Sequence, residues 1–159
     1  MQTTMWLKLG VAGLVVAFCT LLGYLAAAKY RARRAYFDQL YALNERFLSE
    51  LAYSRRPVSE LLQEGGFRGE FAETVTAFCA RKGAAIPERL LSERERAVVS
   101  DYFSMLGRGD ARSQTGYFTA KRQDLAAFRA DSAAEAKKRG ELYLRLGVLA
   151  GLAAVILIL

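Results

Sequence analysis

The sequence predicts an all-α protein in which a helical bundle lies between an N-terminal and a C-terminal transmembrane helix. An uncharged apolar run lies near each end of the chain, and apolar residues between the two runs recur every three or four positions. No segment alternates polar and apolar residues as a half-buried strand does. We expect residues 1–29 to form the first anchor, residues 30–141 the bundle and residues 142–159 the second anchor.

The first apolar run, residues 9–28, would span about 30 Å as a helix, which is the thickness of a bilayer's hydrocarbon core. The closing run is about 27 Å long as a helix, and so nearly spans the hydrocarbon core, if it starts at Leu142 and the Arg145 side chain bends back to the headgroups. Each run has an alternative. Ala26 and Ala28 could mark signal-peptide cleavage after the first, and the second could be a packing helix. We expect both anchors to be retained.

Basic residues follow the first run and precede the second. Cations next to membrane spans are kept in the cytoplasm, so we expect a cytoplasmic bundle with both chain termini on the far side of the membrane. Seven basic side chains are expected to lie at the membrane surface against anionic lipid headgroups: Lys29, Arg31, Arg33, Arg34, Lys137, Lys138 and Arg139.

Composition argues against an enzyme and against nucleic-acid binding. The net charge is +7, yet residues 40–136 carry as many acidic as basic side chains. Histidine is absent from the sequence, and no phosphate-binding loop or nucleophile motif occurs, so we expect no catalytic, cofactor, metal or small-molecule site. Cys79, near Arg81 and Lys82, could be an activated nucleophile, but its helical spacing from Phe71 and Val75 favours a small core residue.

Turn and cap residues divide the bundle into helices. The first cytoplasmic helix should end near Ser54, and Pro57 should open a short helix that closes at Gly65. A third helix should run through residues 71–78. Ser92 followed by Glu95 predicts a capping box.

Gly107 is placed to end the helix that this capping box opens, and Asp110 to cap the last helix. In the apolar runs, the pairs Gly23–Ala27 and Gly147–Gly151 would allow two helices to approach closely.

Helix lengths bring two turns together. A helix from residue 30 to about 54 rises roughly 35 Å, and the last helix returns roughly 48 Å from Asp110 to Glu141. The turns around residues 55–56 and 108 should therefore meet at the end that points into the cytoplasm. We expect this end to bind a partner, the alternative being a solvated cap with local acidic partners. Its candidate residues are Arg55, Arg56, Arg108, Asp110, Arg112 and Gln114.

The turn LGRGDARSQ, followed by a long helix that ends in YLRLGVLAGLAAVILIL, resembles the stage III sporulation protein AB family of spore-forming bacteria. Leu106, Gly107, Asp110 and Gln114 match the family's turn, whereas Gly109 stands where serine is usual. The family's soluble domain is similar to the cytoplasmic domains of the type II secretion F protein, an inner-membrane platform that works beside a secretion ATPase.

The resemblance implies a non-enzymatic, membrane-anchored platform or adaptor subunit of a secretion-like sporulation channel. Such a subunit would couple a cytoplasmic secretion-type ATPase to other membrane subunits. It would lie in the mother-cell membrane that faces the forespore, the outer forespore membrane. The alternative is a generic double-anchored helical scaffold, or a type II secretion or pilus platform relative outside sporulation.

Overall fold

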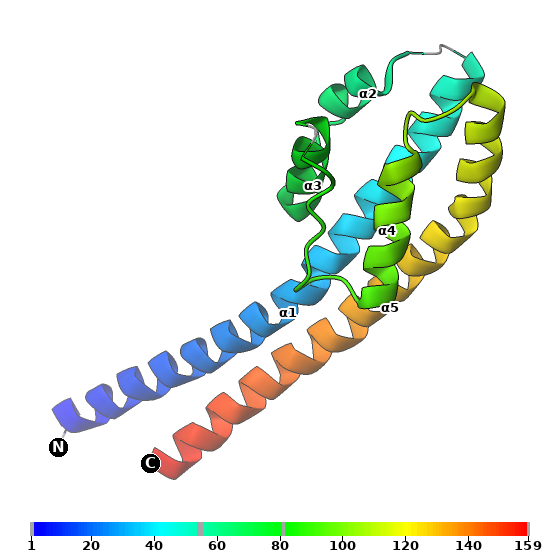
Figure 1. The fold of residues 1–159 in the computed structure, drawn as a ribbon. Coiled ribbons are helices and arrows are strands. Elements are labelled where there is room, and N and C mark those ends of the chain that lie inside the picture. Colours follow the sequence, from blue (N-terminus) through cyan, green and yellow to red (C-terminus); the bar gives the residue numbers. More distant parts are fainter. Residues whose placement is uncertain (1, 54–55, 81, 159) are drawn as a thin grey trace. The chain divides into compact units, whose positions relative to one another are not determined.

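The structure is a computed structural model that describes residues 2–53, 56–80 and 82–158. These residues form five helices and no strand, so the predicted all-α class is confirmed. The helices are α1 (Gln2–Tyr53), α2 (Val58–Glu64), α3 (Gly69–Cys79), α4 (Glu93–Met105) and α5 (Ala111–Ile158) (Figure 1).

The chain divides into two compact units, and α1 and α5 each contribute to both. The helix-pair unit comprises residues 1–31 and 134–159, and the bundle unit comprises residues 32–133. The boundaries that we predicted after residues 29 and 141 separate membrane anchors from the bundle. They are a different division from these two units and stay predictions.

The helix ends follow the sequence signals. The last helical residue of α1 is Tyr53, next to the predicted Ser54. Pro57 takes the N-cap position of α2 with an extended ψ of 139°, and its carbonyl accepts from the amides of Glu60 and Leu61. A proline at this position has no N–H to leave unsatisfied, so the short helix opens without strain.

The predicted capping box at the start of α4 is confirmed. The Ser92 hydroxyl accepts from the Glu95 amide, and a Glu95 carboxylate oxygen accepts from the Ser92 amide at 2.9 Å. At the other end, Gly107 has φ +78°, a left-handed conformation that glycine adopts without steric cost. Glycines inside α5 leave that helix unbroken.

An aromatic core joins the helices of the bundle unit. The Phe71 ring lies 5.1 Å from the Tyr36 ring and 6.3 Å from the Phe103 ring, which links α1, α3 and α4. The Phe118 ring lies 4.8 Å from the Phe47 ring and so links α5 to α1. All five rings are almost fully buried, and each such side chain stabilises the fold by about 2 kcal/mol.

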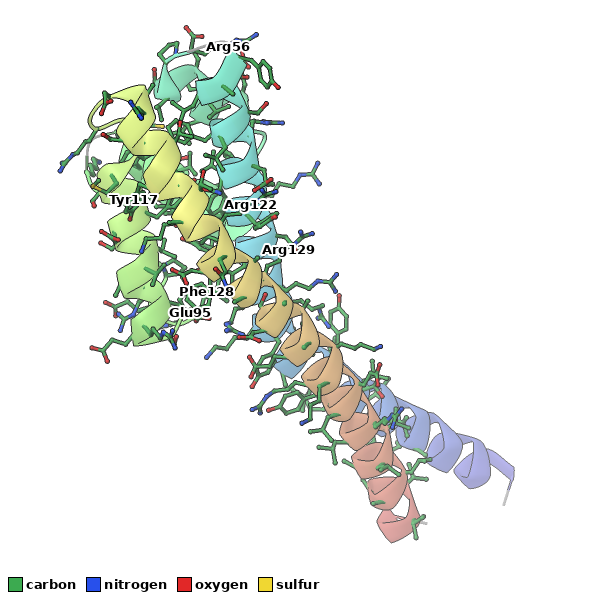
Figure 2. All side chains as sticks on the ribbon, turned by 90° about the vertical axis from the view of Figure 1, so that its right-hand side faces the viewer. Arg56, Glu95, Tyr117, Arg122, Phe128 and Arg129 are labelled. Carbon is green, nitrogen blue, oxygen red and sulfur yellow. The ribbon has the colours of Figure 1, made fainter. Side chains whose placement is uncertain are left out.

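Ion pairs line the exposed contact between α1 and α5 in the bundle unit. Arg122 lies 2.7 Å from Glu45, and Arg129 lies 2.7 Å from Asp38. Figure 2 shows both arginines along the same helix. Exposed ion pairs contribute little free energy to folding. The main effect of these two pairs is therefore on the antiparallel alignment of the two helices.

The helix-pair unit is held together by small residues, as the spacing predicts. A Cβ added at Gly23 would lie 2.5 Å from the Tyr143 carbonyl oxygen, and one added at Gly147 would lie 2.8 Å from the Cys19 carbonyl oxygen. Gly151 and Ala27 are buried in the same contact. The two backbones therefore approach as closely as small-residue pairs allow.

Apolar side chains cover the outer faces of this unit. Leu14, Phe18, Leu149 and Ile156 are each more than half exposed. Among the described residues, α1 alone contains a segment long and apolar enough to cross a membrane, and only 11% of that segment is buried. The described part of the chain thus has one candidate membrane-spanning helix. The second anchor stays a prediction.

Candidate partner-binding end of the bundle

The two turns predicted to meet do lie at one end of the bundle unit. Figure 1 shows the end of α1 and the start of α5 side by side there. We call this region the turn end and define it as residues 56–58 and 106–114. Arg55, which we expected here, lies outside the described residues.

The arginines of the turn end differ in their surroundings. Arg56 is half exposed and its guanidinium lies 3.5 Å from the Glu64 carboxylate, so it has a local acidic partner. Figure 2 shows Arg56 at the opposite end of the bundle unit from Glu95. Arg108 and Arg112 are exposed, and neither has a carboxylate partner among the residues that the structure describes.

Asp110 and Gln114 build the turn itself. Gln114 is buried, and its side-chain amide donates to the Arg108 carbonyl at 2.7 Å. Hydrogen bonds from Ser113 lower the pKa of the exposed Asp110 carboxyl, with further help from the Arg112 amide. The carboxylate therefore caps the first turn of α5, as predicted.

A cavity of about 840 Å³ opens beside the turn end. It is bounded by α2, the end of α3, α4 and the turn after α4. Its lining residues are Val58, Ser59, Leu62, Gln63, Phe78, Cys79, Gly83, Ala84, Ser100, Phe103, Ser104, Leu106, Gly107 and Arg108. Sequence reasoning missed this cavity, because it depends on how α2 and α3 pack beside α4.

Cys79 lines the cavity and is exposed, so the expected core position is wrong. The helical spacing does place Cys79 on the face of Phe71 and Val75. It is, however, the last residue of α3 and faces the cavity rather than a neighbouring helix. The described part of the chain contains no cluster of ligands that could hold a metal ion.

The basic residues of the helix-pair unit lie on its surface or against aromatic rings. Lys29, Lys137 and Lys138 are exposed. The Arg31 guanidinium carbon lies 4.0 Å from the centre of the Tyr24 ring. Arg139 lies 3.1 Å from Glu135 and 5.2 Å from the centre of the Tyr30 ring. Aromatic rings of this kind are typical of a membrane–water interface.

In the bundle unit, Arg34 is exposed and lies 3.6 Å from Asp38, whereas Arg33 points into the unit. The Arg33 guanidinium pairs with the Glu95 carboxylate, and its Nε donates to the second carboxylate oxygen at 3.4 Å. The side chains are 17% and 5% exposed. The sequence carries a signal for this inward position, because Arg33 lies on the same helical face as the buried residues Tyr36, Phe37 and Leu40.

These features define a class: an all-α protein with one candidate membrane-spanning helix and a helical bundle whose described residues hold no metal cluster. Residues 8–88 and 73–159 match the family model of stage III sporulation protein AB. The chain belongs to the stage III sporulation protein AB family, as the turn and the closing helix predicted. No curated protein and no solved structure matches it significantly.

Membership of this family implies a role in a sporulation complex. Proteins of this family are components of a sporulation channel and are not known as enzymes. Family membership therefore favours a role in sporulation over the alternative of a scaffold or secretion platform outside sporulation.

Proposed function

We propose that the protein is a non-enzymatic platform or adaptor subunit of the sporulation channel complex. It is held in the membrane by both apolar segments and couples a cytoplasmic secretion-type ATPase to the other membrane subunits. The bundle unit lies in the mother-cell cytoplasm, both termini lie across the membrane, and the membrane is the one that faces the forespore.

The observation that carries this proposal is the pair of exposed arginines at the turn end. Arg108 and Arg112 have no carboxylate partner among the described residues, although acidic side chains elsewhere in the bundle pair with arginines. A cationic surface of this kind accelerates the approach of an acidic partner and selects it against others. The turn that carries both arginines is held by Gln114 and Asp110, so their spacing is fixed before a partner arrives.

The proposal is tested by charge reversal at the turn end. The full-length chain in lipid nanodiscs is immobilised, and capture of the purified ATPase of the same complex is measured over a series of salt concentrations. We expect Arg108→Glu with Arg112→Glu to weaken capture by about tenfold or more at low salt, because like charges at an interface cost several kcal/mol. The difference should shrink as salt screens the charges.

Matched controls lie at the other end of α4. Arg89 and Arg94 are exposed and lie within six residues of Glu95 in the sequence. Figure 2 shows Glu95 at the opposite end of the bundle unit from Arg56 of the turn end. The Arg89→Glu, Arg94→Glu variant changes the net charge by the same amount and should capture the ATPase as the unchanged chain does. Equal loss in both variants would mean that net charge matters and the turn end does not. Unchanged capture by the turn-end variant would show that the ATPase does not dock at the turn end.

A further inference from the structure

We propose that the cavity beside the turn end is a docking groove for an amphipathic helix of a partner protein, with an acidic residue of that helix seated against Arg108. This inference concerns the ligand of the groove and does not depend on the ATPase being that partner.

The floor of the groove is apolar and firmly held. Leu62, Phe103 and Leu106 line it and are nearly fully buried, whereas Val58 and Phe78 are half-buried. Phe78 and Phe103 are in ring contact at 5.3 Å. A helix that laid an apolar stripe on this floor would remove the remaining exposed apolar surface from water, which is the main source of affinity in helix-in-groove complexes.

The dimensions suit a helix better than a compact ligand. A second hollow of about 350 Å³ continues the first and shares Leu62, Gln63 and Cys79 with it. Leu62 and Gln63 of α2 and Cys79 at the end of α3 line both hollows. An elongated groove accepts side chains from successive turns of a helix, about 5.4 Å apart along its axis. A compact ligand would need polar groups that converge on one point.

Charge selects the kind of helix. Arg108 is the only charged residue in the lining of the larger hollow among the described residues, and no acidic side chain lines either hollow. Lys82 is exposed next to Gly83, which lines the larger hollow. The other polar lining residues, three serines and Gln63, are neutral and tolerate either charge. A helix that carries carboxylates at one end of its apolar stripe is therefore favoured over a basic one.

The native thiol of Cys79 reports on occupancy, because it lies where the two hollows join. The probe is a library of displayed 16-residue helical peptides with randomised surface positions. The library is selected on the full-length Cys19→Ser chain in nanodiscs, and a second selection uses the same chain with Arg108→Glu. Enriched peptides are then synthesised, and the rate of Cys79 alkylation by a maleimide is measured with and without each peptide.

We expect the first selection to enrich peptides with apolar residues at i, i+3 or i+4 and i+7 and an acidic residue at one end of that stripe. Saturating peptide should slow Cys79 alkylation by about tenfold or more, and Arg108→Glu should invert the preference from acidic to basic peptides. Ser59→Trp, which fills the groove from α2, should abolish both effects. Ser49→Trp, an exposed position on α1 outside the lining, should change neither.

Three results would overturn the proposal. The first is enriched peptides without the apolar spacing. The second is peptides that bind equally well after Arg108→Glu, which would place the binding site elsewhere. Alkylation of Cys79 that is already blocked by the nanodisc lipid without peptide would assign the groove to lipid. Failure of the unchanged chain to capture the ATPase, with peptide binding intact, would instead contradict the ATPase proposal alone.

Discussion

The carboxylate of Glu95 joins two helices of the bundle unit: it pairs with Arg33 of α1 and closes the capping box of α4 with Ser92. The pair is largely withdrawn from water, since the Glu95 side chain is only 5% exposed. A partly buried pair loses more when one partner is removed than an exposed pair does, because the remaining charge stays without compensation.

The first prediction concerns the stability of this contact. Arg33→Ala should lower the free energy of unfolding of the detergent-solubilised chain by about 3 kcal/mol, because it leaves the Glu95 charge buried. Ser92→Ala removes only the cap and should cost about 1 kcal/mol. Urea unfolding monitored by helical circular dichroism measures both.

Arg34→Ala, which removes an exposed pair with Asp38, is the matched control and should cost less than about 1 kcal/mol. An equal loss for Arg33→Ala and Arg34→Ala would show that the Glu95 contact contributes no more than a surface pair.

The second prediction is a pH dependence. Burial acts to raise the pKa of Glu95, but hydrogen bonds from Arg33 and Ser92 outweigh it and hold the pKa below its usual value. The stabilisation is therefore fully present above the unfolded pKa of about 4.3 and is lost as the pH falls through the lower folded pKa. Stability measured from pH 6 downward should fall less steeply in Glu95→Gln than in the unchanged chain. Parallel curves would contradict this assignment.

Helix ends were the part of the fold that could be predicted from sequence. Ser92, Glu95 and Gly107 determine their local conformations through their own side chains, or through the lack of one, so short-range chemistry is enough. The close approach at Gly147 was also predictable, because residue size alone limits the distance between two helices.

The positions of single side chains within a cluster were harder to predict. Arg33 and Arg34 belong to the same basic run, and only the helical face shared with Tyr36 and Leu40 turns the first one inward. Gln114 was a candidate partner-binding residue by sequence, yet its amide holds the turn from inside. The groove depends on tertiary packing, which no local pattern encodes.

The third prediction concerns the helix-pair unit. Gly147→Ala would place a Cβ 2.8 Å from a backbone oxygen of the opposite helix, which cannot move without shifting that helix. We expect a loss of about 2 kcal/mol, as for overpacked cores. Unfolding in mixed micelles with increasing dodecyl sulfate measures it. Gly13→Ala adds a methyl group where nothing lies within 4 Å and should cost nothing. Equal tolerance of the two substitutions would contradict the close contact.

The central claim is that the bundle unit lies in the cytoplasm, with the chain's N-terminus across the membrane, and thiol accessibility tests it most directly. Intact bacterial cells that express single-cysteine chains are treated with a membrane-impermeant maleimide. One chain keeps Cys79 in a Cys19→Ser background, and the other carries Thr3→Cys with both native cysteines replaced by serine. We predict that Thr3→Cys reacts in intact cells, whereas Cys79, which is exposed on the bundle unit, reacts only after the cells are permeabilised. Labelling of Cys79 in intact cells would contradict the account.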